Sequence, residues 1–302
     1  APPAETVTAG PEGMTCLVID GEILKNLRIN VDGLLQELGC KGNALESTTK
    51  FYASMPKHKH GSGQGFVDVP LKMLEPVSLL GEGGFGSVYR VRANGEEYAL
   101  KRMSKGHIER SNSGQSVRQE REMLTLIASP FVIALFRSYR DEQYVYMLLE
   151  LVAGGNLYSL LCEHQDVLLG DEPRGSAGMF YSACVASALD HLHENNIAYR
   201  DLKLENVLLD AQGYAKLCDL GFARFVLGKT NTLLGTPEYM APEMIDPPHA
   251  HGTQVDWWAL GVLTFELLSG QTPWDDLAID DDPMGQLLAI RDSQEKGLPD
   301  LL

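Results

Sequence analysis

The spacing of hydrophobic residues changes from one section of the chain to the next. Near the N-terminus, an apolar and β-branched run at residues 16–19 predicts a short strand. Apolar residues then recur at every third or fourth position between Leu24 and Leu38, which predicts a helix. From residue 41 to about residue 69 this periodicity is lost, and we interpret that segment as a flexible linker.

A different pattern begins at about residue 71. Short runs typical of strands occupy residues 77–80, 87–91, 98–101 and 144–150, with glycine-containing turns among them. Longer helical patterns follow at residues 177–194 and 255–268. A half rich in strands followed by a half rich in helices predicts an α+β fold with a cleft between the two halves.

The composition and net charge of the chain indicate which kinds of molecule it can bind. With 44% hydrophobic and 8% aromatic residues, the chain can form a core, which excludes disorder as an overall description. The 41 acidic residues exceed the 25 basic ones, which argues against nucleic acid and favours basic proteins or peptides as partners. The five cysteines are scattered, as is typical of a reducing compartment. No apolar run reaches membrane-spanning length, so we expect no membrane span and a cytoplasmic location.

A glycine-rich segment gives the first indication of chemistry. Residues 81–86 spell G-x-G-x-x-G, in which glycines allow the backbone to approach phosphate oxygens closely. Dinucleotide-binding folds use the same spelling, but their turn leads into a helix. Here a strand-like run follows at residues 87–91. This context favours a hairpin that covers phosphates and excludes a Rossmann oxidoreductase.

A lysine stands on the next predicted strand. Lys101 follows Gly86 by 15 residues. A buried lysine is costly unless it meets an anion, and the α- and β-phosphates of ATP together with a helical carboxylate such as Glu120 would supply one. The alternative is an ordinary surface lysine on an edge strand.

The strongest motif is the run at residues 199–206, followed by Asp219, Leu220 and Gly221. Phosphoryl transfer needs an acceptor for the hydroxyl proton, a cation on the transferred phosphate and oxygen ligands for Mg²⁺. Asp201, Lys203 and the pair Asn206 and Asp219 supply these groups in that order.

Together these motifs resemble the eukaryotic protein kinases, whose fold has a β-rich small lobe and a helical large lobe. Tyr199-Arg200-Asp201, the Gly-Thr-Pro-Glu-Tyr run at 235–239 and the Asp-Trp-Trp-Ala-Leu-Gly run at 256–261 are similar to the AGC group. Residues 80–86 and 105–108 resemble its cyclic-nucleotide-dependent members, and residues 10–20 resemble the end of a cyclic-nucleotide-binding domain. A regulatory domain fused ahead of the kinase is typical of the cGMP-dependent protein kinases.

The resemblance implies three sections. Residues 1–45 would be the C-terminal remnant of a cyclic-nucleotide-binding domain, residues 46–70 a linker that couples it to the catalytic cleft, and residues 71–302 the kinase domain. Within the latter, we expect the small lobe at about 71–152 and an incomplete large lobe at about 153–302. Pro3 stands where the family has an arginine for the cyclic phosphate, so we expect that the remnant does not bind cyclic nucleotide by itself.

The resemblance also implies an ATP site built from both lobes. The glycine-rich loop would cover the phosphates, four apolar side chains would enclose the adenine, and a gatekeeper and hinge would follow. These residues are Leu80, Gly81, Glu82, Gly83, Gly84, Phe85, Gly86, Ser87, Val88, Ala99, Lys101, Leu149, Glu150, Val152, Asn156 and Leu208. Lys101 would pair with Glu120 in the active state, and Thr236 would hold the catalytic loop and favour serine or threonine acceptors.

Regulatory and substrate residues follow from the same resemblance. Thr232 matches an activation-loop phosphosite, modified by an activating kinase or by autophosphorylation, with Arg200 and Arg224 to bind the phosphate. The alternative is a solvated loop threonine. Ser116 stands where close relatives have a histidine that joins this interaction.

An acidic pair completes the implied site. Glu205 and Glu266 match the carboxylates that read an arginine two residues before the target, which predicts basic serine- or threonine-containing substrates. Asn156 replaces an acid that helps to read a basic residue one position further out. The alternative is that Glu205 and Glu266 are structural carboxylates.

Two features depart from the family. Leu220 replaces the usual phenylalanine after the metal-binding aspartate, and Glu243 lacks its usual buried arginine because only Arg291 follows it. Residues 266–302 carry nine acidic and two basic residues, and we expect no kinase-like helix at this end.

We therefore expect an ATP- and Mg²⁺-dependent serine/threonine kinase that cyclic nucleotide, with cGMP favoured, regulates in the full-length protein. One alternative is a catalytically impaired kinase fold that binds ATP or a partner. The other is an enzyme similar to the cAMP-dependent kinases.

Overall fold

The computed structural model describes residues 6–9, 14–17, 68–83, 86–165, 168, 176–226, 228–232, 234–275 and 283–296. The expected helix between residues 24 and 38 and most of the expected linker lie outside these ranges. In the N-terminal section, β1 (Thr6–Ala9) pairs antiparallel with β2 (Met14–Leu17). The strand predicted at residues 16–19 therefore begins two residues earlier than expected, and its partner was missed.

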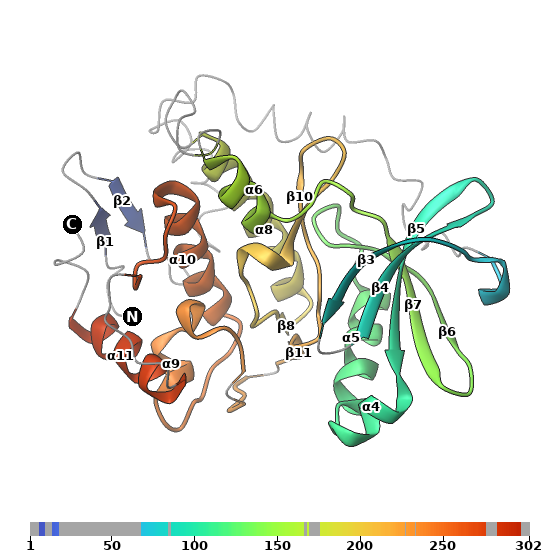
Figure 1. Ribbon diagram of the computed structural model, residues 1–302. Coiled ribbons are helices and arrows are strands. Elements are labelled where there is room, and N and C mark those ends of the chain that lie inside the picture. The colour runs from blue at the N-terminus through green and yellow to red at the C-terminus, as the bar shows by residue number, and fades with distance from the viewer. Residues whose placement is uncertain are drawn as a thin grey trace.

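A five-stranded antiparallel sheet forms the small lobe, with the strand order β3-β4-β5-β7-β6 (Figure 1). Its strands are β3 (Glu75–Gly83), β4 (Gly86–Ala93), β5 (Glu96–Ser104), β6 (Leu135–Arg140) and β7 (Tyr144–Glu150). Four of them contain the runs predicted from the sequence, whereas β6 was not predicted. Helices α4 (Lys105–Arg110) and α5 (Gly114–Leu126) connect β5 to β6.

The large lobe is mainly helical. Its helices are α6 (Leu157–Glu163), α8 (Ser176–Glu194), α9 (Pro242–Ile245), α10 (Val255–Ser269) and α11 (Pro283–Lys296). Short strands β8 (Ile197–Ala198) and β11 (Arg224–Phe225) form one pair, and β9 (Val207–Leu209) and β10 (Ala215–Leu217) form another. The 3-10 turns are η2 (Leu71–Met73), η3 (Leu204–Asn206) and η4 (Pro237–Tyr239). This bilobal α+β architecture confirms the fold expected from the sequence.

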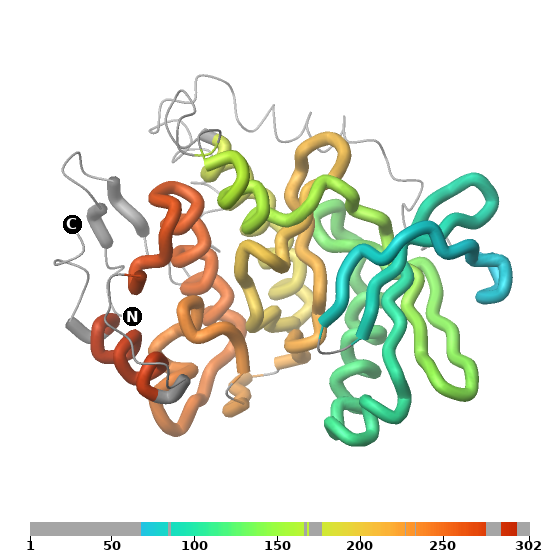
Figure 2. Tube along the Cα trace, in the orientation of Figure 1, coloured from blue at the N-terminus to red at the C-terminus, as the bar shows by residue number. Residues whose placement is uncertain are grey.

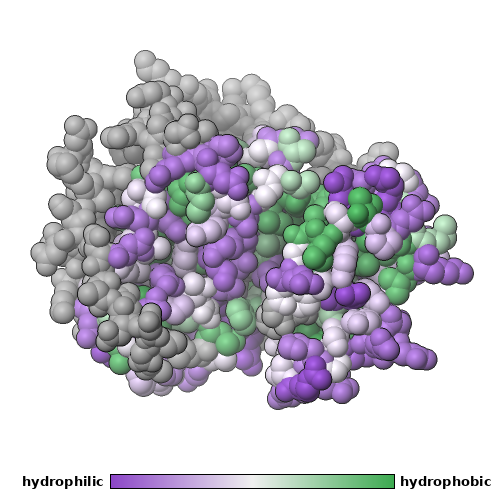
Figure 3. Space-filling view, in the orientation of Figure 1, coloured by the Kyte–Doolittle hydropathy of each residue, from purple (hydrophilic) through white to green (hydrophobic). Residues whose placement is uncertain are grey.

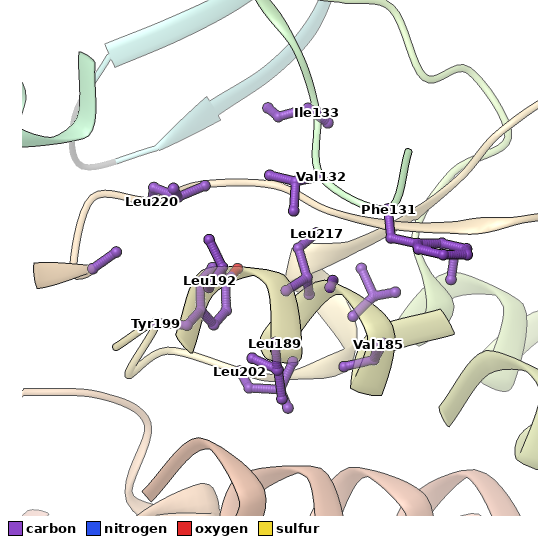
Figure 4. Packing of buried hydrophobic residues seen from close by; sticks show 14 of the residues in the cluster. Phe131, Val132, Ile133, Val185, Leu189, Leu192, Tyr199, Leu202, Leu217 and Leu220 are labelled. Atoms are coloured by element: carbon purple, nitrogen blue, oxygen red, sulfur yellow. The ribbon is translucent and has the colours of Figure 1, made fainter. Parts of the chain in front are cut away.

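The core runs through both lobes. Met103, Met123 and Met147 from the small lobe belong to the same buried cluster as Leu189 of α8 and Leu263 of α10. Figure 4 shows its centre, where Val185, Leu189 and Leu192 of α8 pack beneath Leu217. A Cβ on Gly178 would lie 3.0 Å from a methyl carbon of Leu268, so glycine permits the close approach of α8 and α10.

Helix α11 contradicts the expectation that no helix would form near the end of the chain. Its residues Leu287 and Ile290 are buried at a spacing of three, as on one face of a helix. Leu287 packs with Met244, Ile245 and Val255 in a cluster beneath α10. The prediction was wrong because it was based on the acidic composition of this region and overlooked the spacing of its apolar residues.

The end of the expected linker packs on the small lobe. Val69 is 1% exposed and lies in a cluster with Val91, Leu100 and Leu148. Tyr139 donates its hydroxyl proton to the carbonyl oxygen of Val69 at 2.7 Å. These contacts fix the chain to the sheet before β3 begins. In Figure 2 this segment lies where the blue colour of the tube starts.

The described surface is mixed. Figure 3 shows hydrophilic residues over most of this face, with hydrophobic residues gathered toward the small lobe. Strand β3 contributes the exposed side chains of Val77, Leu79 and Leu80. None of the helices in the described ranges has the length and apolar composition needed to cross a bilayer.

Candidate active site

A buried lysine joins three parts of the structure. Lys101 lies on β5, the central strand of the sheet, and its Nζ is 2.7 Å from Oε1 of Glu120 on α5 and 3.2 Å from Oδ1 of Asp219. Burial alone would lower the pKa of Lys101, but the two carboxylates outweigh it and the pKa is raised. The lysine is therefore positively charged and does not lie on an edge strand.

The catalytic loop holds Asp201 through short-range contacts. Asn206 donates its amide protons to the carbonyl oxygen of Asp201 at 2.8 Å and to Oδ2 at 2.9 Å. Thr236 donates to Oδ1 at 3.1 Å, and Lys203 donates to the Thr236 hydroxyl at 3.2 Å. Burial raises the pKa of Asp201, although Lys203, Asn206 and Thr236 each act to lower it. These contacts gather a carboxylate, an ammonium group and a hydroxyl group at one point.

Asp219 and Asn206 offer oxygen atoms to a metal. The side chain of Asp219 keeps 40% of its surface exposed, and its Oδ1 also accepts from the backbone N–H of Gly221 at 3.2 Å. Because Asn206 uses its amide N–H groups on Asp201, its amide oxygen remains as the donor for a cation. Carboxylate and amide oxygens suit Mg²⁺. Among the residues that the structure describes, no cluster of three or more His, Cys, Asp or Glu side chains could hold a metal.

Asp256 anchors the catalytic loop from below. It is 1% exposed on α10, and it accepts the backbone N–H groups of Tyr199 at 2.8 Å and Arg200 at 2.7 Å. Its Oδ2 also lies 2.7 Å from Nε2 of His193. In the sequence, Asp256 was recognised only as part of a group-specific pattern, and this role was not predicted. The available signal was an ionisable residue in the first turn of a mainly apolar helix.

The apolar residues expected around an adenine come from both lobes. Ala99 of β5 lies opposite Leu149 of β7 in the sheet, and Leu208 lies on β9 in the large lobe. Val88 follows the glycine-rich turn on β4, and Leu80 precedes it on β3 as an exposed side chain. The apolar residues expected around the adenine are thus divided between the two lobes.

The glycine-rich segment of the expected ATP site joins β3 to β4. Gly81, Glu82 and Gly83 end β3, Gly86 and Ser87 begin β4, and Gly84 and Phe85 lie outside the described ranges. Gly86 has a φ of +139°, and a Cβ there would lie 2.1 Å from the carbonyl oxygen of Arg102. No other residue fits this position.

Val152 lies in the expected hinge. The side chain of Asn156 accepts a hydrogen bond from the backbone N–H of Ser159, so Asn156 caps α6.

Two arginines lie near the activation loop. Arg224 donates to the hydroxyl oxygen of Thr232 at 3.2 Å. Arg200 donates from Nε and Nη2 to the carbonyl oxygen of Phe222, and its buried Nη1 has no hydrogen-bond partner among the described residues. Burial and repulsion by Arg224 lower the pKa of Arg200. The two cations thus lie close together, and an anion between them would relieve their repulsion. Ser116, which stands where close relatives have a histidine, lies on α5.

The acidic pair lies at the large lobe. Glu205 is exposed in η3, whereas Glu266 of α10 is 7% exposed and accepts a hydrogen bond from the Tyr239 hydroxyl. Burial raises the pKa of Glu266 to about 7, and the Glu205 carboxylate acts in the same direction. A cationic side chain placed between the two would be strongly favoured when both are ionised.

Two departures from the family pattern can be located. Leu220 is fully buried in the core, directly after the expected metal-binding residue Asp219. Glu243 accepts from Nε2 of Gln254 at 3.4 Å, while Arg291 pairs with Asp246 and Asp292. Within the described ranges, Glu243 therefore pairs with no arginine.

Comparison with known proteins agrees with this geometry. A model of the protein kinase domain matches residues 74–296. The chain therefore belongs to the protein kinase family, whose members use ATP and a divalent metal.

Within that family, the chain is similar to the cyclic-nucleotide-dependent enzymes. It is 38% identical to Drosophila melanogaster cGMP-dependent protein kinase, isozyme 2 forms cD5/T2, over 276 residues, which are 90% of this chain and 27% of the relative. It is 44% identical to human cGMP-dependent protein kinase 2 over 209 residues, 68% of this chain and 26% of the relative. Human cAMP-dependent protein kinase catalytic subunit PRKX is 42% identical over 217 residues, 71% of this chain and 58% of the relative. The chain thus spans about a quarter of the length of these cGMP-dependent relatives.

The anchor at Asp256 gives a prediction about stability. In Asp256→Asn, an amide group would replace one of the oxygens that accept from the loop, leaving a buried N–H without a partner. We expect the free energy of unfolding to fall by about 3 kcal/mol. Urea denaturation followed by tryptophan fluorescence measures this change. The exposed Asp190→Asn on α8 is the control, and a loss no larger than in that control would contradict the role given to Asp256.

Proposed function

We propose that this chain transfers the γ-phosphate of ATP to a serine or threonine hydroxyl of a protein substrate, with Mg²⁺ as the metal. One observation carries the proposal above all others. Asp201, Lys203 and Thr236 form one hydrogen-bonded group in a structure where Lys101 also pairs with Glu120 and Asp219. The ion pair and the catalytic loop are therefore both arranged for phosphoryl transfer.

Each residue then has a chemical role. The hydroxyl oxygen of the substrate attacks the γ-phosphorus, the bond from that phosphorus to the β–γ bridging oxygen breaks, and ADP leaves. Asp201 orients the hydroxyl group and receives its proton. Lys203 neutralises charge that develops on the transferred group, and Lys101 holds the α- and β-phosphates. Asn206 and Asp219 would hold Mg²⁺, which supplies charge neutralisation on the phosphate oxygens when bound.

Replacing the proton acceptor tests this function. Asp201→Asn should keep ATP binding and lower transfer from labelled Mg·ATP to an Arg-Arg-x-Ser peptide by about 10²- to 10⁴-fold, because the amide cannot accept the proton. Binding is measured separately by calorimetry. Transfer by the unmodified chain that equals the variant's would contradict the proposal and favour the alternative of a kinase fold that only binds ATP or a partner.

We extend the proposal to basic substrates. Glu205 and Glu266 lie on the large lobe as a pair of carboxylates, and the net charge of −16 favours positively charged partners. An arginine two residues before the acceptor would contact both carboxylates. Asn156, which caps α6, is neutral, whereas the family has an acidic residue there that helps to read the substrate residue three positions before the acceptor. We therefore expect weaker selection for a basic residue at that substrate position.

The pKa of Glu266 makes this recognition dependent on pH. With a pKa of about 7, Glu266 is largely ionised at pH 8 and largely protonated at pH 6. Arginine binds the ionised form, so KM for the Arg-Arg-x-Ser peptide should rise as the pH falls through 7. Glu266→Gln should remove this dependence and raise KM about tenfold at pH 8, the weaker end of the range for a charged hydrogen bond. A peptide with alanine in place of the inner arginine is the control, and an equal pH dependence with that peptide would contradict the assignment.

We also propose that phosphorylation of Thr232, by an activating kinase or by autophosphorylation, orders the activation loop. The neighbouring cations Arg200 and Arg224 support this, since one of them already donates to the Thr232 hydroxyl. A phosphate would add nearly two negative charges at that point. It would also relieve the repulsion between the two guanidinium groups.

A threonine pair tests this regulation. Protein phosphorylated at Thr232, as shown by mass spectrometry, should have a kcat about tenfold above that of Thr232→Ala, because the ordered loop keeps Asp201 aligned. Thr230→Ala, two residues away, should behave as the unmodified chain. Equal kcat for phosphorylated and unphosphorylated protein would refute the role of Thr232.

Regulation by a cyclic nucleotide, with cGMP favoured, belongs to the longer protein in this proposal. Its support is the similarity of the first section to a cyclic-nucleotide-binding domain, with residues 1–45 as its remnant and 46–70 as the coupling linker. The similarity to the Drosophila and human cGMP-dependent protein kinases supports it as well. We further propose a cytoplasmic location, for which the scattered cysteines are the support.

A further inference from the structure

A buried ion pair joins Glu150 of the expected hinge to Lys216, a residue to which no role has been assigned so far. Nζ of Lys216 lies 2.7 Å from Oε1 of Glu150, and the two side chains are 3% and 16% exposed. Glu150 is the last residue of β7 in the small lobe, and Lys216 is the middle residue of β10 in the large lobe. The pair therefore connects the end of the sheet to the other lobe.

The backbone around this pair is held as well. Glu150 donates its N–H to the carbonyl oxygen of Ala134 at 2.9 Å, and Ala134 donates its N–H to Oε2 of Glu150 at 3.3 Å. The preceding residues bind β10, since Leu217 N donates to Phe131 O at 2.8 Å and Ile133 N donates to Leu217 O at 3.0 Å. Between them, Val132 forms a bridge with Leu217, and Figure 4 shows these two side chains next to each other. Backbone and side-chain contacts thus hold Glu150 against the large lobe.

Both ends of the ion pair adjoin residues of the expected adenine pocket. Glu150 directly follows Leu149, the gatekeeper. Lys216 lies directly opposite Leu208 in the β9–β10 pair, and opposite residues of an antiparallel pair share one face. The ion pair therefore links the end of β7, at the expected hinge, to the strand pair that carries the floor of the expected pocket.

We propose that Lys216 is a positioning residue, which fixes the hinge through Glu150 and thereby sets the affinity for ATP. If the hinge is already fixed before ATP binds, no conformational entropy is lost in ordering it on binding. This preorganisation increases the affinity for ATP. The Lys216–Glu150 pair coexists with the Lys101–Glu120 pair, so it belongs to the aligned arrangement of the site. The inference rests on the proposed function, because ATP is its ligand.

Three variants test the inference. Lys216→Met removes the cation, Lys216→Arg keeps the charge, and the double variant Lys216→Met with Glu150→Leu removes both charges so that no buried charge is left unpaired. KM for Mg·ATP and kcat are measured with the basic peptide, and equilibrium binding is measured with a trinitrophenyl derivative of ATP. We expect the Met variant and the double variant to raise KM and Kd roughly fivefold to tenfold, with kcat within about twofold. Lys216→Arg should stay within about twofold of the unmodified chain.

The matched control is Arg90→Met, which breaks the partly exposed pair of Arg90 with Glu97 on the small lobe and should change neither constant. Thermal denaturation shows which variants are folded. If Lys216→Met does not fold, the double variant provides the comparison. Unchanged ATP affinity in the folded double variant, a raised kcat, or equal defects in the Arg and Met variants would overturn the inference. An unmodified chain that binds the derivative without transferring phosphate would refute the proposed function, while the binding series would still test Lys216.

Discussion

The structure depends above all on the ion pairs of the buried Lys101, which require three separate parts of the chain to meet. An ammonium group inside a protein is costly unless carboxylates or phosphates surround it. Here one carboxylate comes from Glu120 on α5, 19 residues after Lys101, and the other from Asp219 in the segment after β10, 118 residues away. The sheet, the helix and the large lobe must therefore meet at this one cation. The fold and the phosphate-binding end of the site form together as a result.

The catalytic loop poses a different constraint, because its backbone is irregular. Arg200 has a φ of +66° and Asp219 a φ of +51°, values that side chains other than glycine adopt at a cost. Such a conformation persists only where surrounding groups hold it. Asp256 supplies that support to Arg200 by accepting two consecutive backbone N–H groups, and Lys101 and Gly221 bind the carboxylate of Asp219. A helix thus supports Arg200, which directly precedes Asp201, and an ion pair supports Asp219.

The sequence predicted those parts of the fold whose signal is local. The glycine-rich turn, the strand that carries Lys101 and the catalytic loop each follow from neighbouring residues, and the lobes follow from the change in hydrophobic spacing. Strand β6 was missed because Leu135–Arg140 contains three polar residues and pairs only on one edge with β7. Helix α11 was missed because its apolar face is narrow. Lys216 and Asp256 were missed as site residues because their roles depend on partners 66 and 56 or more positions away.

The distribution of charge links these constraints to function. The chain has only 25 basic residues against 41 acidic ones, yet among the described residues three basic side chains, Lys101, Arg200 and Lys216, are buried. Two of them face carboxylates across the boundary between the lobes, and the third lies beside the activation loop. Since each buried cation requires an anion nearby, phosphate groups and internal carboxylates compete for the same few positions. The excess of acidic residues remains for the surface, where it favours the approach of positively charged substrates. In the proposed function, the buried Lys101 would hold phosphates of ATP, and the carboxylates of Glu205 and Glu266 would bind a basic peptide.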